Sequence, residues 1–114
     1  MIGMKTSFGR SGIHDWWMQR LSAVLMLVYV VVISYQLVTL EELNFATWSA
    51  MFSSLWMKAF TFLVVVAISV HAWVGLWIVS TDYIKPVVIR NSFQAVVLVI
   101  CVAMIAWAGM IFWG

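Results

Sequence analysis

A single histidine stands in the middle of an apolar stretch, and an acidic residue and a tyrosine follow where the stretch ends. His71 is the thirteenth of the 23 residues between Lys58 and Asp82, and Tyr83 comes directly after Asp82. An ionisable side chain in an apolar medium is costly and usually faces a protein interior or a functional site. An imidazole can bind haem iron as an axial ligand or relay protons. His71 is therefore the first candidate functional residue.

The helical neighbours of His71 leave two interpretations open. Ala67 and Gly75 lie four residues before and after it, so the three residues share one helix face and form a shallow trench. Such a trench seats a closely packed helix, in which case His71 only hydrogen-bonds to that neighbour. It also admits a flat macrocycle whose iron His71 would ligate. The other histidine, His14, is too distant to ligate the same iron, so if His71 ligates a six-coordinate haem, the second axial ligand must come from another chain.

A second group of polar residues is expected near one membrane surface. If the helix of His71 continues, Asp82 and Tyr83 lie about 16–18 Å along it. A phenol beside a carboxylate can hydrogen-bond a lipid-soluble carbonyl or exchange protons with it, although Tyr is also an ordinary interfacial residue. Arg20 either reaches lipid phosphate or pairs with a buried acid such as a haem propionate. His14 indicates no function by itself.

Composition determines which elements can position these residues. The chain has 114 residues, 66% of them hydrophobic, and only ten Lys, Arg, Asp and Glu side chains. A transmembrane helix needs about 20 mainly apolar residues. Three uncharged runs meet this length, at residues 21–40, 59–81 and 91–114. The sequence therefore predicts an all-α membrane protein with a single domain over residues 1–114 and three transmembrane helices, at about 15–40, 55–81 and 89–113.

Charge and capping residues predict the orientation and the helix ends. Lys5, Arg10, Arg20, Lys85 and Arg90 fall on one side of the predicted membrane, and Lys58 alone falls on the other. The positive-inside rule then places the N-terminus in the cytoplasm and the C-terminus in the periplasm. The N-terminus does not resemble a cleavable signal peptide. Asp15 is expected as the N-cap of the first helix, Ser53 or Ser54 as that of the second, and Pro86 interrupts the last connection. The sequence contains no basic patch that would indicate nucleic-acid binding.

Two segments resemble a known family. "GRSGIHDWWMQR" (residues 9–20) and "SVHAWVGLWIVSTDYIKP" (residues 69–86) are similar to the hydrophobic membrane anchor subunits of bacterial succinate dehydrogenase, of the enterobacterial type, in which two small anchor chains hold one haem. The resemblance implies that His71 is one axial ligand of a b-type haem shared with the second membrane anchor subunit. It implies that Arg20 and His14 lie near the haem propionates. It also implies that Tyr83, helped by Asp82, borders the ubiquinone site.

The resemblance further implies the setting of the chain. It would be a multi-pass anchor in the bacterial inner membrane, in a heteromeric helical bundle with the second anchor, docking the iron–sulfur and flavoprotein subunits. FAD and the iron–sulfur clusters would belong to those partners, so the isolated chain would carry no succinate-oxidising site. Two alternatives stay open: the anchor of a fumarate reductase, and a haem-free docking or assembly protein. A small multidrug transporter is disfavoured, because all four carboxylates lie outside the uncharged runs.

Overall fold

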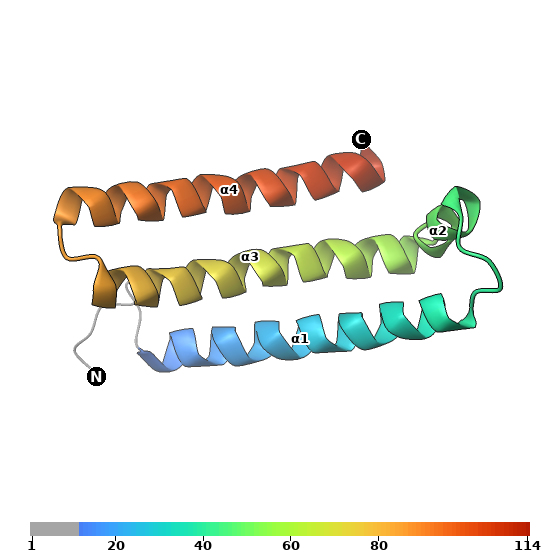
Figure 1. Ribbon diagram of the computed structural model, residues 1–114, viewed down its shortest axis with the longest axis horizontal. Coiled ribbons are helices and arrows are strands. Elements are labelled where there is room, and N and C mark those ends of the chain that lie inside the picture. Colours follow the sequence, from blue (N-terminus) through green and yellow to red (C-terminus); the bar gives the residue numbers. More distant parts are fainter. Residues whose placement is uncertain (1–11) are drawn as a thin grey trace.

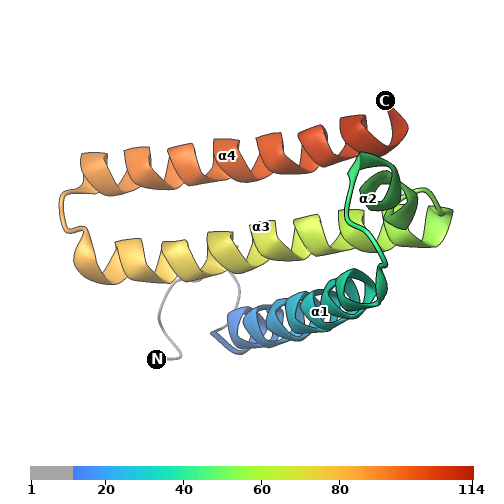
Figure 2. The same ribbon diagram turned by 45° about the vertical axis from the view of Figure 1, so that its right-hand side comes forward.

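The computed structural model describes residues 12 to 114, and four α-helices account for most of them. These are α1 (Gly12–Thr39), α2 (Phe45–Met51), α3 (Leu55–Tyr83) and α4 (Val87–Trp113). The three long helices run side by side and antiparallel, with α3 between α1 and α4 (Figure 1). The turned view keeps α3 in the middle and shows α2 folded against one end (Figure 2). We call that end the α2 end and the opposite one, where α3 connects to α4, the Pro86 end.

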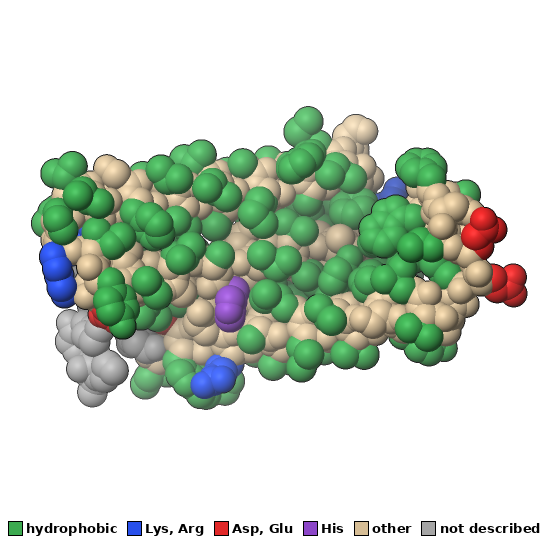
Figure 3. Space-filling view, in the orientation of Figure 1, with side chains coloured by type: hydrophobic (Ala, Val, Ile, Leu, Met, Phe, Trp, Pro, Cys, Tyr) green, Lys and Arg blue, Asp and Glu red, His purple; other side chains and the backbone are tan. Residues whose placement is uncertain are grey.

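The three long helices are long and apolar enough to cross a membrane, which confirms the predicted fold class. At 1.5 Å per residue, the 28 residues of α1 extend about 42 Å, more than the ~30 Å of a hydrocarbon core. Green apolar side chains cover the length of the bundle; most charged ones lie toward its two ends, and one blue side chain lies away from them, close to the purple histidine (Figure 3). The chain therefore presents apolar surface to lipid or to further transmembrane helices.

The interior between the helices is built from small and polar residues. The largest fully buried side chains in the described region are Val74 and Ser80, and the other buried polar residues include Ser22, Ser69 and Gln94. Large apolar side chains such as Leu, Ile and Trp point outward along all three long helices. Lipid tails are as apolar as leucine, so helices in a membrane associate through close packing and hydrogen bonds rather than through burial of apolar area.

Helix ends partly follow the sequence expectations. Ser54 is the N-cap of α3, with its hydroxyl accepting from the Met57 amide. α3 continues through Tyr83, so Asp82 and Tyr83 form its last turn, and Pro86 occupies the N-cap position of α4. The N-cap expectation for Asp15 was wrong, because α1 already begins at Gly12 and Asp15 lies within its first turn. A carboxylate there still interacts favourably with the helix dipole.

The connection between α1 and α3 contains the short helix α2, in a segment for which the sequence predicted no transmembrane helix. Asn44 caps α2, and its side chain and that of Thr47 each accept a hydrogen bond from the other residue's amide. This reciprocal capping box satisfies amide groups that would otherwise lack partners at the start of a helix. α2 thereby fixes the direction in which the chain turns from α1 into α3.

The side on which each end lies remains a prediction. Lys85 lies in the connection at the Pro86 end, with Arg90 in the first turn of α4, and Glu41 and Glu42 lie at the α2 end. This distribution keeps the positive-inside argument for a cytoplasmic Pro86 end. Lys5 and Arg10, which contribute to the same argument, lie outside the described residues.

Candidate functional site

His71 lies near the middle of α3 and faces α1. Its side chain is half-buried, and its Nδ1 lies 3.1 Å from the hydroxyl oxygen of Ser22 on α1. Within residues 12–114 this is the only hydrogen bond of the His71 side chain, so Nε2 has no partner there. One ring nitrogen is thus engaged in the fold, and the other is available to a group from outside the described chain.

Ser22 belongs to a small polar cluster on α1. Its side chain is only 6% exposed, and its hydroxyl donates to the backbone carbonyl of Gln19 over 3.0 Å. The side chain of Gln19 lies one turn away along the same face, and its Oε1 is buried with no hydrogen-bond partner in the described region. A buried acceptor without a donor is unfavourable by about 1–3 kcal/mol. The seam beside His71 therefore contains a polar atom that the described residues leave unsatisfied.

The trench of small residues is partly occupied by α1. Ala67 is buried, and a Cβ atom added at Gly75 would lie 3.3 Å from Nε2 of Gln19. Gly75 thus allows the Gln19 side chain to approach the backbone of α3, which is the helix-packing interpretation of the trench. A hollow of about 220 Å³ remains beside Ala67 and Ser22. We call the contact formed by Gln19, Ser22 and Tyr29 with Thr61, His71 and Gly75 the α1–α3 seam.

The donor set around His71 fits one kind of metal centre. The described residues contain no group of three or more His, Cys, Asp or Glu that could hold a bare metal ion. A haem iron needs no such group, because the porphyrin supplies four nitrogens and the protein only axial ligands. The imidazole of His71, whose Nε2 has no partner among the described residues, matches the contribution of one axial ligand from this chain. His71 as the ligand remains a prediction.

Arg20 lies two residues before Ser22 on α1, so its backbone is within about 3 Å of the depth of Ser22 along the helix axis. Its guanidinium lies 5.4 Å from the centre of the Trp16 ring, and it forms no ion pair within residues 12–114. Because Ser22 contacts His71 near the middle of α3, Arg20 lies deeper in the bundle than its position at the end of an uncharged run suggests. A cation at that depth favours an acidic partner from outside the chain.

His14 and Asp15 are adjacent in the first turn of α1. Nδ1 of His14 lies 3.8 Å from a carboxylate oxygen of Asp15, and Asp15 is only 4% exposed. The pair lies about eight residues, or roughly 12 Å, from Ser22 along the axis. His14 is thus nearer to the Pro86 end than to His71, and its predicted role near a propionate remains untested.

Asp82 and Tyr83 form a separate region from His71. Both lie on the last turn of α3, where the side chain of Tyr83 is 79% exposed, and Tyr83 lies about 18 Å from His71 along the helix. The residue two positions before Asp82, Ser80, is fully buried instead and accepts from the Gln94 amide over 2.8 Å. The exposed phenol of Tyr83 therefore lies within one helical turn of a residue, Ser80, that is hydrogen-bonded to α4.

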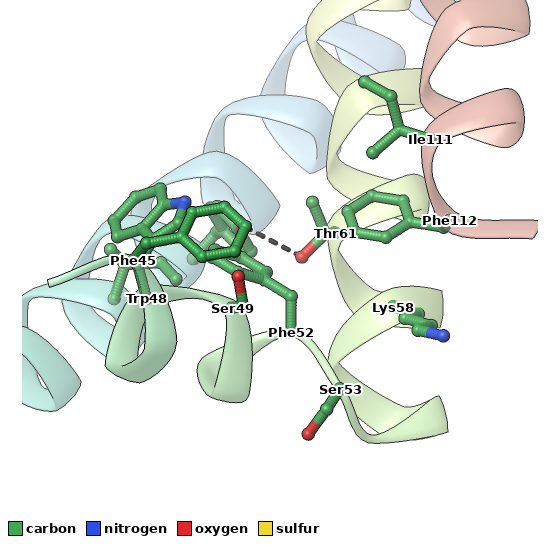
Figure 4. Close-up of a pocket in the computed structure, with 11 residues that line it drawn as sticks. Phe45, Trp48, Ser49, Phe52, Ser53, Lys58, Thr61, Ile111 and Phe112 are labelled. Carbon is green, nitrogen blue, oxygen red and sulfur yellow. Dashed lines mark hydrogen bonds between the residues drawn. The ribbon is translucent and has the colours of Figure 1, made fainter.

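The structure also shows residues that the sequence analysis did not consider. Ser22 and Gln19 are the partners of the candidate site on α1, and the only signal for them was that polar residues occur inside or beside an apolar run. At the α2 end, a cavity of about 640 Å³ lies between α2 and the long helices. Its lining includes the aromatic residues Phe45, Trp48 and Phe112 and one charged residue, Lys58 (Figure 4). The dashed line in Figure 4 is the hydrogen bond between Tyr29 and Thr61, 2.8 Å long.

Comparisons with known proteins agree with the resemblance seen in the sequence. Residues 4–107 match the model of the family described as "Succinate dehydrogenase/Fumarate reductase transmembrane subunit". The chain is 36% identical over 104 residues to the succinate dehydrogenase hydrophobic membrane anchor subunit of Coxiella burnetii (strain RSA 493 / Nine Mile phase I), covering 91% of this chain and 90% of that protein. With its three apolar helices, the chain therefore belongs to the succinate dehydrogenase/fumarate reductase transmembrane subunits, as a membrane anchor of that oxidoreductase complex.

Proposed function

We propose that the chain is the anchor of a succinate dehydrogenase that binds b-type haem jointly with a second membrane anchor and helps to form the site of ubiquinone reduction. The observation that carries the proposal is the geometry of His71 near the middle of α3, with Nδ1 bonded to Ser22 and Nε2 without a partner among residues 12–114. Family membership supplies the class of complex, and this imidazole supplies the reason to expect a cofactor in the membrane.

At the haem, His71 would hold the iron through Nε2, and Arg20 and His14 would bind the propionates. Haem b supplies one-electron redox chemistry when it is bound. The forked donors of Arg20 suit a carboxylate, and the ring of Trp16 beside its guanidinium restricts where the fork can point. His14 would add a second donor from the first turn of α1.

At the quinone, Tyr83 would donate a hydrogen bond to a ubiquinone carbonyl, with Asp82 beside it. The 79% exposure of Tyr83 supports this role, because the phenol is available to a ligand and to partner subunits at the Pro86 end. Reduction of ubiquinone to ubiquinol takes up two electrons and two protons. The electrons would come from the iron–sulfur subunit, which receives them from the FAD of the flavoprotein subunit. This chain would bind and orient the quinone and would contain no site for succinate.

The apolar outer faces of α1 and α4 support a heteromeric bundle. Exposed large hydrophobic side chains run along both helices, including Leu27 and Val31 on α1 and Val99 and Ile111 on α4. The second anchor would cover part of this surface and lipid the rest. A cytoplasmic Pro86 end in the bacterial inner membrane would bring Tyr83 to the side where the iron–sulfur and flavoprotein subunits dock.

A difference spectrum of the purified complex tests the proposal. We expect the reduced-minus-oxidised spectrum to show a low-spin b-type haem that is lost or becomes high-spin in His71→Ala. Thr61→Val is the matched control, because it removes another hydrogen bond from the α1–α3 seam ten residues away. The control should keep the haem spectrum. A complex of His71→Ala with an unchanged haem spectrum would refute the proposed ligation.

The hydrogen bond between His71 and Ser22 also favours one alternative, in which His71 only joins two helices of a haem-free docking protein. That alternative predicts an assembled wild-type complex without haem, and a loss of stability in His71→Ala similar to that of the control. An anchor of fumarate reductase would use the same residues with electrons flowing in the opposite direction. The ratio of succinate oxidation to fumarate reduction by the purified complex separates the two enzymes.

A further inference from the structure

The hydroxyl of Ser22 has two hydrogen-bonding neighbours but only one proton. Its oxygen lies 3.0 Å from the Gln19 carbonyl and 3.1 Å from Nδ1 of His71. A backbone carbonyl can only accept, so a bond to Gln19 requires that the hydroxyl donate to it. The hydroxyl can then only accept from the imidazole. All three groups are satisfied together only if Nδ1 of His71 carries the proton.

The opposite arrangement forms one hydrogen bond fewer. If Ser22 donated to Nδ1, the neutral imidazole would carry its proton on Nε2, which has no acceptor within the described residues. The Gln19 carbonyl would also lose the hydroxyl bond. An N–H without an acceptor is costly in an apolar medium. The chain of bonds from Nδ1 to Ser22 to Gln19 therefore favours a lone pair on Nε2.

We propose that Ser22 is a positioning residue, which fixes His71 as the tautomer protonated on Nδ1 and so presents the Nε2 lone pair to the iron. This inference rests on the proposed haem ligation by His71, and it adds a role for α1 that the ligand alone does not require. Groups that accept a hydrogen bond from the second nitrogen of a ligating histidine orient the ring and raise its basicity. The backbone carbonyl of Gln19 contributes to this arrangement, because it accepts the only proton of the Ser22 hydroxyl and leaves that hydroxyl to accept from His71.

The test compares the assembled complexes of wild type, Ser22→Ala and Ser22→Thr. Ser22→Ala removes the acceptor for Nδ1–H, so we expect haem affinity to fall by about tenfold, as is common for such outer partners. The midpoint potential of the haem should rise, because a less basic imidazole stabilises ferric iron less. Its low-spin electron paramagnetic resonance signal should broaden as the ring loses its fixed orientation. Ser22→Thr keeps a hydroxyl at the same position and should restore all three properties toward wild type.

Ser69→Ala is the matched control, because it removes a buried serine hydroxyl from the face of α3 that contacts α4, on the same helix as His71. Unchanged potential, signal and affinity are expected for it. If Ser22→Ala does not assemble, Ser22→Cys carries the same test, because a thiol of similar size is a weak acceptor. Loss of haem in His71→Ala together with wild-type haem properties in Ser22→Ala or Ser22→Cys would overturn the inference and leave the proposed function intact. Haem properties that survive His71→Ala would instead overturn the proposed function itself.

Discussion

The two faces of α3 use polar residues in different ways. Toward α4, Ser80 bonds to Gln94, and Ser69 and Cys101 each bond to the other's backbone carbonyl. We call this contact the α3–α4 seam. Toward α1, Ser22 bonds to His71 and Tyr29 to Thr61. The serine, cysteine and glutamine groups named in the first seam are all paired with one another, whereas the second leaves Nε2 of His71 and Oε1 of Gln19 without partners among the described residues. Nε1 of Trp77, also on α3, is buried without a hydrogen bond among those residues.

This difference distinguishes polar residues that join two helices by hydrogen bonds from those that have polar atoms without a hydrogen-bond partner. In a membrane every buried polar group needs a hydrogen bond, and a packed seam can supply it from within. The α3–α4 seam does so with small hydroxyl, thiol and amide groups. The α1–α3 seam keeps atoms unsatisfied at the depth of His71. We infer that the α3–α4 seam is structural and that the α1–α3 seam is where function is built.

The largest effect is expected for Gly75→Leu in the α1–α3 seam. Even a Cβ at this position lies 3.3 Å from Nε2 of Gln19, so a leucine would push α1 away and separate Ser22 from His71. Overpacking of about 1–3 kcal/mol corresponds to a roughly 5- to 150-fold change in an equilibrium constant. We therefore expect haem content, measured by pyridine haemochrome assay of the purified complex, to fall at least severalfold.

Gly109→Leu is the control for this variant in the α3–α4 seam, where an added Cβ would lie 3.6 Å from Phe62. We expect lower thermal stability but a normal haem content in the complex that assembles. Equal loss of haem in both variants would show that the two seams do not differ in function.

A smaller effect is expected for Ser80→Ala in the α3–α4 seam. The variant leaves the amide of Gln94 buried without its acceptor, which costs about 1–3 kcal/mol. Gln94→Leu removes the amide itself, so no donor is left without an acceptor, and it should destabilise the complex less than Ser80→Ala does. Thermal denaturation in detergent measures both, and the haem spectrum should be unchanged in both. A stability order opposite to this one would mean that the bond to Gln94 is not what the seam depends on.

The smallest effect is expected for Tyr29→Phe. The change removes the hydroxyl that pairs with Thr61 but keeps the ring 5.1 Å from that of Phe60. Hydrogen bonds between membrane helices contribute about 0.6 kcal/mol on average, so the shift in denaturation temperature should be small. Haem content and potential should match wild type. A marked change in either would extend the functional part of the α1–α3 seam to the α2 end.

Much of the fold could be predicted because the solvent leaves few choices. Long uncharged runs in lipid must form helices, and Ser54 and Pro86 are positioned as their chemistry suggests. Asp15 was misassigned because an acidic residue is favourable both at an N-cap and within the first turn. α2 was not assigned, because seven residues carry too weak a periodic signal. For the candidate site, His71 stood out as an ionisable group in an apolar run, whereas Ser22 did not.

The sequence by itself determined the membrane class, the three spans and the central place of His71, because each follows from the high cost of polar groups in hydrocarbon. The tertiary structure decided the register of α1 against α3, which joins residues 49 positions apart and brings Ser22 to Nδ1 of His71. It also set the depth of Arg20. Register depends on which small residues let two helix backbones approach, and here Gly75 accommodates Gln19. That complementarity of shape arises only when both helix faces are present together.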